Sequence, residues 1–241
     1  METILNIAMW SGPRNLSTAM MRSFSQRADC TVWDEPFYAA YLAETGLGHP
    51  MREEVIEAGE RDAAIVSKRC AAPGPGAHFY QKHMTHHMLD SFDLSFLDCV
   101  RSVFLIRHPA RVVASYHAKR ENPVSGDLGF VEQKRLFERA CEHEGRIPLV
   151  IDAHDIREDP RRALSALCDG LKIGFDPAML EWPPGPHEAD GVWGRHWYPA
   201  IWQSTGFAPP ESGPPPELPA DLQKLVDQAM PVYEYLHRHR I

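Results

Sequence analysis

Residues 4–23 read ILNIAMWSGPRNLSTAMMRS, and this stretch decides the fold. Residues 4–9 are almost continuously apolar, which is typical of a strand covered on both faces. A break at residues 11–13 follows, and Ser17 and Thr18 then open a segment with helical apolar spacing. A helix that begins directly after a strand presents free backbone N–H groups and the positive end of its dipole. The stretch therefore predicts a loop that binds a phosphate or a sulfate.

This loop differs from the one that binds nucleoside triphosphates in P-loop proteins. That motif has Gly, four further residues, and then Gly-Lys-Ser/Thr. Here the later positions after Gly12 are Ser17, Thr18 and Ala19, so the lysine is missing. Arg14 supplies a cation at the tip of the loop instead. The alternative interpretation is an ordinary strand and helix, with Ser17 as the helix N-cap.

The composition is that of an ordinary globular chain. Its 241 residues are 44% hydrophobic and 24% charged, which favours one domain with a full-sized core. The net charge of −8 argues against general affinity for nucleic acid, so an anion has to be held by a local basic site. The five cysteines contain no pair at CxxC spacing, which indicates neither a zinc site nor a disulfide framework. The N-terminal apolar run is too short to cross a bilayer and lacks the charge of a signal peptide, so we expect a cytoplasmic protein without a membrane partner.

Expected strands and helices alternate along the chain. Strands are expected at residues 30–33, 79–82, 100–106 and 149–152, and helices at 52–64, 85–97, 127–144 and 160–171, with a further helix starting at Pro109. This alternation predicts the α/β class, as a single-domain three-layer sandwich over residues 1–241 with a central, mostly parallel sheet. The Pro- and Trp-rich segment at about 176–220 is expected to be irregular, and a closing helix is expected at about 221–239.

A second informative stretch is RSVFLIRHPARVVASY, residues 101–116. Arg107 stands at the carboxyl end of an expected strand, where open α/β sheets bind their ligands. Ser115 lies six residues past Pro109, or roughly 9 Å up the helix axis, which is a span that one arginine and one phosphate bridge. An arginine fork and a serine hydroxyl together suit a phosphate. In the alternative interpretation, Arg107 only caps a helix and Ser115 is a surface residue.

The two stretches together resemble the sulfotransferase family. In that family the first loop is similar to Pro-Lys/Arg-Ser-Gly-Thr-Thr, and a later strand is followed by Arg-x-Pro, five residues, and Ser-Tyr. Residues 150–160 (VIDAHDIREDP) are similar to a third family signature, in which a strand leads to an acidic residue and then Asp-Pro. The resemblance spans about residues 4–175 and implies a P-loop NTPase-like topology. It also implies 3′-phosphoadenosine 5′-phosphosulfate as the sulfuryl donor, with no metal.

The resemblance implies roles for particular residues. The family's first loop cradles the 5′-phosphosulfate of the donor, so Arg14, Ser17 and Thr18 are expected on that side. The second motif holds the 3′-phosphate, so Arg107 and Ser115 are expected there. Further donor-binding residues are expected at Ser11, Gly12, Asn15 and Arg195.

The chain departs from the family pattern in places. Leu16 stands where the loop of the family has Gly, and Asn15 replaces a Ser. The late Arg-Lys-Gly segment of the cytosolic branch is not evident. Arg195 lies in the corresponding region, with Trp197 or Tyr198 as candidates for stacking on adenine. This combination resembles a divergent, mostly bacterial branch of the family.

Transfer to a hydroxyl or an amine needs a general base. Glu35 follows the second expected strand, where several branches of the family place a catalytic Glu. His83 is the competing candidate, because its placement is similar to that of the catalytic His of the cytosolic enzymes. Glu35 is preferred, and Lys82 and Arg14 are expected to stabilise charge on the transferring group.

Three readings of function follow. The leading one is a sulfotransferase acting on a small-molecule acceptor, with a homodimer among the expected assemblies. The first alternative is a P-loop-type kinase or nucleotide hydrolase, for which Asp152 is the available acidic metal ligand. The second is a non-catalytic nucleotide-binding module, which Leu16 in the loop suggests. His83, His86 and His87 lie at helical spacing, but without an HExxH motif we expect no metal site.

Overall fold

The computed structural model describes residues 5–119 and 123–241. Its centre is a five-stranded sheet in the order β2-β3-β1-β4-β5, in which each neighbouring pair is parallel. The strands are β1 (Leu5–Ser11), β2 (Cys30–Asp34), β3 (His78–Met84), β4 (Arg101–Ile106) and β5 (Leu149–Asp152). Strand β1 lies in the middle and is buried on both faces, as its apolar run predicts.

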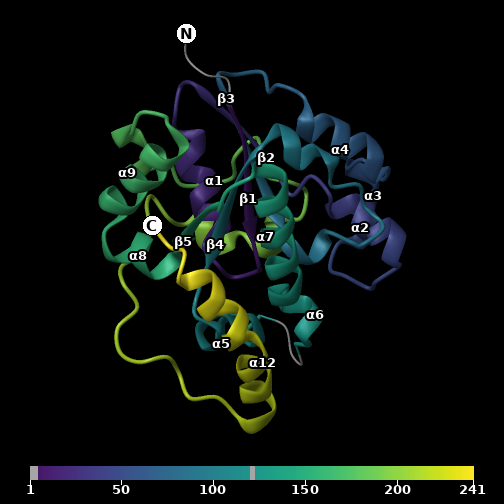
Figure 1. Ribbon diagram of the computed structural model, residues 1–241. Coiled ribbons are helices and arrows are strands. Elements are labelled where there is room, and N and C mark those ends of the chain that lie inside the picture. Colours follow the sequence, from purple (N-terminus) through teal and green to yellow (C-terminus); the bar gives the residue numbers. More distant parts are fainter. Residues whose placement is uncertain (1–4, 120–122) are drawn as a thin grey trace.

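Helices cover both faces of the sheet (Figure 1). Because side chains alternate along a strand, Ile7 and Met9 of β1 face one apolar cluster, and Ala8 and Trp10 face the other. The first cluster is completed by α1 (Ser17–Ser25), α8 (Ala153–Glu158), α9 (Pro160–Leu171) and the 3-10 turn η3 (Pro177–Leu180). The second is completed by α4 (Ala63–Ala71), α7 (Phe130–Glu144) and α12 (Ala220–His237). The predicted single-domain, three-layer α/β sandwich is confirmed.

Two smaller apolar clusters join the remaining helices to this body. Helix α5 (Pro109–His117) and α6 (Ser125–Leu128) pack with α12. Helices α2 (Tyr38–Thr45) and α3 (Arg52–Ala58) pack against the late segment that contains α10 (Gly194–Trp197) and α11 (Pro199–Trp202). The late segment therefore holds short helical turns and extended chain, and it covers the region that follows β2. In the described part of the chain, no helix combines the length and apolar character needed to cross a membrane.

The helix predicted over residues 85–97 is wrong. The structure has two 3-10 turns instead, η1 (Thr85–His87) and η2 (Ser95–Cys99). The Asp93 carboxylate accepts hydrogen bonds from the backbone N–H and the hydroxyl of Ser95, which closes a local turn in place of a helical one. The apolar residues of the stretch, such as Met88 and Phe96, are buried against the sheet without helical backbone.

The helix predicted over 127–144 is interrupted at Gly129. This residue has φ of +68°, which ends α6 and precedes α7. A Cβ atom there would lie 2.5 Å from the Thr85 hydroxyl, and that hydroxyl donates to the Gly129 carbonyl oxygen at 2.9 Å. Glycine therefore satisfies both the backbone conformation and the close approach. The helix expected at 52–64 is likewise divided, into α3 and α4.

Candidate active site

The loop between β1 and α1 makes a tight turn at the carboxyl edge of the sheet. Arg14 and Leu16 have positive φ of 63° and 74°. Leu16 is the N-cap residue and contributes no side-chain hydrogen bond, and Ser17 is already the first helical residue. The alternative in which Ser17 caps the helix is therefore wrong, and no side-chain cap occupies the N–H groups of the first turn of α1. The left-handed backbone at Leu16 also explains why a glycine suits this position in similar loops.

A cavity of about 230 Å³ opens in front of this loop. Among the residues predicted for the site, the cavity wall contains Arg14, Ser17, Thr18, Glu35, Lys82, Arg107 and Ser115. The wall also contains His49, His86, His87, Trp197 and Tyr198, which come from later loops and from α10. The topology thus brings both predicted motifs and the predicted acid–lysine pair to one edge of the sheet.

The two motifs are joined by direct contacts. The Arg14 Nε atom donates to the Ser115 hydroxyl at 3.0 Å, and Arg107 Nη1 donates to the Arg14 carbonyl oxygen at 2.5 Å. Burial and the neighbouring charge of Arg107 lower the pKa of Arg14 from its ordinary value. The buried Nε of Arg107 has no hydrogen-bond partner among the described residues. Two adjacent guanidinium groups, one with an unsatisfied donor, favour an anion at this place.

A buried acid–lysine centre forms the opposite wall. Lys82 Nζ donates to Asp34 at 2.8 Å and to Glu35 at 2.5 Å, and it contacts the Tyr198 hydroxyl at 2.8 Å. Burial raises the pKa of the Glu35 carboxyl above its ordinary value, although the charge of Lys82 opposes the shift. Burial alone would lower the pKa of Lys82, but the charges of Asp34 and Glu35 outweigh it and raise the pKa. Glu35 is thus a carboxylate with increased affinity for a proton, placed on the cavity wall.

Two partners of this centre were not predicted. The Tyr198 hydroxyl donates to the Asp34 carboxylate at 2.8 Å, and Trp193 Nε1 donates to the same carboxylate at 3.1 Å. Tyr198, suggested by the sequence as an adenine-stacking residue, therefore holds the carboxylates through its hydroxyl. Asp34 could have been suspected from the sequence, because it is an acidic residue next to Glu35. Trp193 and Tyr198 could not, because they lie more than 150 positions away in the chain.

His83 is not at the cavity. Its ring stacks on Trp10 with a centroid distance of 4.4 Å and contacts Gln81 at 3.1 Å, on the opposite face of the sheet from Lys82. Burial lowers the pKa of His83 to about 3. Alternation along β3 separates the two neighbours, because the strand continues to Met84 instead of ending at Lys82 as expected. The structure does not support the hypothesis that His83 is the base, and it leaves Glu35 as the candidate at the cavity.

The other residues predicted to bind the sulfuryl donor do not line the cavity. The Ser11 hydroxyl donates to the Gly12 carbonyl oxygen at 2.7 Å, and the Asn15 amide donates to the Leu105 carbonyl oxygen at 3.3 Å. A Cβ at Gly12 would lie 2.7 Å from a backbone oxygen of Leu128, so this glycine permits the packing of the loop. These three residues shape the loop. Arg195 instead pairs with Glu54 at 2.9 Å on the surface.

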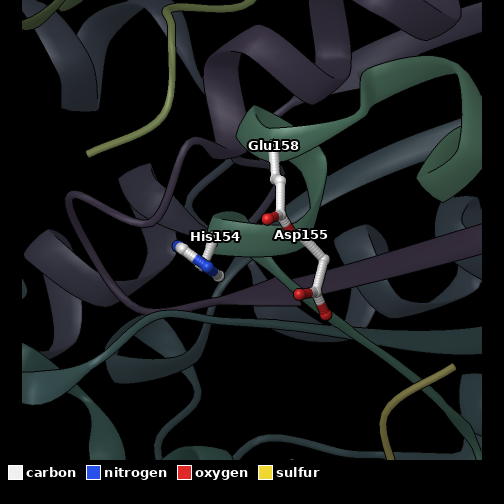
Figure 2. Close-up of side chains that lie close together, drawn as sticks. All are labelled: His154, Asp155 and Glu158. Atoms are coloured by element: carbon white, nitrogen blue, oxygen red, sulfur yellow. The ribbon is translucent and has the colours of Figure 1, made fainter. Parts of the chain in front are cut away.

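The predicted histidine group does not form a cluster of metal ligands. In residues 5–119 and 123–241, the one group of His and acidic side chains with potential ligand atoms within 4.8 Å of one another is His154, Asp155 and Glu158. Figure 2 shows these three side chains on the short helix α8. His154 and Glu158 are exposed, and Asp155 also pairs with Arg240 at 3.4 Å. A solvated turn of this kind is an ordinary surface feature and carries no argument for a metal.

A third group of charges borders the anion side of the cavity. The carboxylate of Glu211, in the Pro-rich segment, contacts three arginines. These are Arg107, Arg111 at 3.3 Å and Arg157 at 2.9 Å. No motif marks Arg111, Arg157 or Glu211 in the sequence, and they come together from α5, α8 and the Pro-rich segment.

The fold and the motifs agree with comparisons to known proteins. The family model described as "Sulfotransferase domain" matches residues 5–240. The chain therefore belongs to the sulfotransferase domain family, and the predicted resemblance is confirmed. Sulfotransfer is the reaction that the description of this family names.

Solved structures of sulfotransferases share the fold. The domain from the olefin synthase of Synechococcus PCC 7002 has a TM-score of 0.52 at 19% identity and covers 94% of both chains. The domain from the curacin biosynthetic pathway has a TM-score of 0.52 at 15% identity over 95% of this chain and 99% of its own. The sulfotransferase from Alicyclobacillus acidocaldarius has a TM-score of 0.57 at 13% identity over 98% and 96%. At these identities the likeness concerns the fold.

Two similar proteins from Arabidopsis thaliana are longer. The branched-chain-amino-acid aminotransferase-like proteins 1 and 2 are 36% and 35% identical over 234 and 235 residues. Each match takes in 97% of this chain but only 42% and 41% of the relative. The chain thus spans less than half the length of these relatives, and their names describe those longer proteins.

Proposed function

We propose that this chain transfers a sulfuryl group from 3′-phosphoadenosine 5′-phosphosulfate to the hydroxyl or amine of a small acceptor. The observation that carries the proposal is that one cavity wall contains both the arginine–serine pair of the two motifs and the Glu35–Lys82 pair. Family membership adds the class of reaction. The donor itself and the acceptor type are the proposed part.

The loop side of the cavity suits the donor. The uncapped first turn of α1, with Ser17 and Thr18 on the wall, offers N–H groups and hydroxyls to the 5′-phosphosulfate. Arg107, with its unsatisfied Nε, and Ser115 offer donors to the 3′-phosphate. The anion held here offsets the close approach of the Arg14 and Arg107 charges.

The acid–lysine side suits the transfer step. Glu35 accepts the proton of the acceptor hydroxyl while the hydroxyl oxygen bonds to sulfur and the bond from sulfur to the 5′-phosphate oxygen breaks. The product 3′-phosphoadenosine 5′-phosphate leaves with that electron pair. Lys82 stabilises the charge that accumulates on the transferring oxygens, since positioning and electrostatics dominate reactions of this kind.

The remaining wall indicates a small, partly apolar acceptor. Tyr38, the first residue of α2 and three residues after Glu35 in the chain, stacks on His87 with a centroid distance of 4.5 Å. Met84, Trp197 and Ile201 complete this apolar part of the wall. An acceptor bound there lies beside the Glu35 carboxylate.

The kinase or hydrolase alternative receives no comparable support. Asp152, its candidate metal ligand, is buried outside the cavity wall and accepts a hydrogen bond from the Tyr233 hydroxyl at 2.8 Å.

The test is calorimetric titration of the purified protein with 3′-phosphoadenosine 5′-phosphate, beside ATP with magnesium and AMP. Selective binding of the bisphosphate, followed by turnover of labelled donor with a panel of small hydroxylated acceptors, supports the proposal. Binding of ATP with magnesium alone contradicts it in favour of the kinase alternative. Bisphosphate binding without turnover on any acceptor favours the non-catalytic module.

A further inference from the structure

Glu211 occupies the centre of an arginine site. Its carboxylate contacts Arg107 at the end of β4, Arg111 one turn further on α5, and Arg157 on α8. The Glu211 side chain is only 15% exposed, and the three arginine side chains are between 14% and 17% exposed. Three convergent guanidinium groups shielded from water are a typical site for a phosphate.

The charges in this site do not balance. One carboxylate faces three guanidinium groups, and Arg14 adds a fourth beside Arg107. Burial by itself would raise the pKa of Glu211, but hydrogen bonding to Arg107 and the charges of the three arginines hold the pKa below its ordinary value. Glu211 is therefore a bound monoanion in a place where a dianionic phosphate interacts more strongly.

The segment that carries Glu211 is attached in a particular way. It forms the long yellow-green loop that leads into α12 (Figure 1). Phe207 and Leu218 pack against apolar clusters at its two ends, while most of the residues between them are exposed.

Hydrogen bonds to the arginines hold the middle of this segment. Arg157 Nε donates to the Pro209 carbonyl oxygen at 2.9 Å, and Arg111 Nη2 donates to the Gly213 carbonyl oxygen at 2.7 Å. The arginine site therefore holds the middle of the segment in place. An anion that binds these arginines in place of Glu211 would free residues 209–213.

We propose that Glu211 is an internal competitor for the phosphate site, so that residues 209–213 form a latch which the 3′-phosphate of the donor displaces. The assignment of the ligand rests on the proposed function, because it is the bisphosphate donor that brings a second phosphate to Arg107. The latch itself rests on the arginine contacts. Arg111 and Arg157 become phosphate ligands once Glu211 has left.

The test compares Glu211→Gln with Glu217→Gln, which removes the same charge at an exposed position of the same segment. Glu211→Gln is expected to bind 3′-phosphoadenosine 5′-phosphate about tenfold more tightly than wild type, a factor equivalent to about 1.4 kcal/mol. AMP, which lacks the 3′-phosphate, is expected to show no such gain, and Glu217→Gln is expected to match wild type.

A second probe, inorganic phosphate, separates the latch from the proposed function. If wild type and both variants all fail to bind the bisphosphate, the proposed donor is wrong. The latch still predicts that Glu211→Gln binds inorganic phosphate more tightly than Glu217→Gln. Equal phosphate and bisphosphate affinities in the two variants overturn the latch. Weaker binding by Glu211→Gln also overturns it, because Glu211 then orients the arginines instead of competing with the ligand.

Discussion

Glu35 occupies an unusual position for a carboxylate, beside the buried Lys82, with a side chain that is only 10% exposed and with φ of +43°. Because burial raises its pKa, the carboxylate is a better proton acceptor than an exposed one. The three contacts of Lys82 fix the two side chains relative to the cavity. In the proposed function, the transfer step depends on the Glu35 carboxylate, whereas donor binding depends on Arg14 and Arg107.

The substitution Glu35→Gln separates these two tasks. We expect it to lower the rate of sulfuryl transfer by about 10²- to 10⁴-fold, the usual contribution of a general base. The affinity for 3′-phosphoadenosine 5′-phosphate is expected to stay unchanged. Steady-state kinetics and calorimetry measure the two quantities, with Glu44→Gln on the exposed face of α2 as the control. An unchanged turnover number would remove Glu35 from the mechanism.

Arg107 is tested by its effect on binding of the bisphosphate, which Glu35→Gln leaves unchanged. Arg107→Ala is expected to weaken binding of the bisphosphate by about 1.5 to 3 kcal/mol, the value of a charge-assisted contact in a partly buried site. Exposed Arg139→Ala is the matched control, since its partner Glu142 lies on the surface of α7. Calorimetric affinity equal to that of wild type in the Arg107 variant contradicts the assignment of the second motif.

At the scale of elements, the helix interruption at Gly129 positions the loop that supports the site. Its carbonyl oxygen accepts from the Thr85 hydroxyl, directly after β3, and the Leu128 carbonyl oxygen approaches Gly12 in the loop between β1 and α1. The α6–α7 junction therefore packs against the ends of both strands that carry the cavity wall.

Gly129→Ala tests this junction. A Cβ would meet the Thr85 hydroxyl at 2.5 Å on a backbone with positive φ, so we expect the free energy of unfolding to fall by about 1 to 3 kcal/mol. Urea denaturation measures the change. The control is Gly126→Ala, in which the added Cβ meets nothing within 4 Å. If the two variants are equally stable, the interruption imposes no constraint.

The elements also show what the sequence could predict. Apolar runs and turn residues were sufficient for the five strands and the parallel sheet, because burial on both faces leaves a clear local pattern. The spacing of Met88 and Phe96 also fits a helix, and the local turn at Asp93 together with the packing of both residues against the sheet excludes one. Local apolar spacing cannot distinguish a helix from irregular chain packed under a sheet.

For the site, Arg14, Lys82 and Arg107 were named from the sequence, and the structure has all three on the cavity wall, while their roles stay predictions. They could not predict partners that arrive from distant segments, such as Tyr198 and Glu211. The choice between Glu35 and His83 as the base could not be settled from sequence either. Because β3 continues to Met84, the neighbours Lys82 and His83 face opposite sides of the sheet.

At the scale of the whole molecule, the buried histidines affect stability. Burial lowers the pKa of His83 to about 3, so the folded protein leaves this ring neutral where the unfolded chain protonates it. The unfolded state then binds more protons, and the free energy of unfolding decreases as the pH falls below about 6.5.

His83→Phe is expected to remove this contribution. Between about pH 6.5 and pH 4, wild type should lose stability relative to the variant by up to about 1.4 kcal/mol per pH unit. Urea denaturation at a series of pH values measures how the free energy of unfolding changes with pH in each protein. The slopes are compared, not the absolute stabilities, because loss of the Gln81 contact lowers the stability of the variant at every pH. His117→Phe, at an exposed position, is the control. Parallel slopes for wild type and His83→Phe would contradict the prediction.

The central place of β1 has a consequence for how the chain is made. Leu5 pairs with His78 on one side, and Ile7 pairs with Arg101 on the other, so β1 is synthesised before both of its neighbours in the sheet and waits for them. Until then its apolar side chains and both of its edges are uncovered, and closing such distant contacts is slow. Nascent chains that end before β4 are therefore expected to expose an aggregation-prone strand.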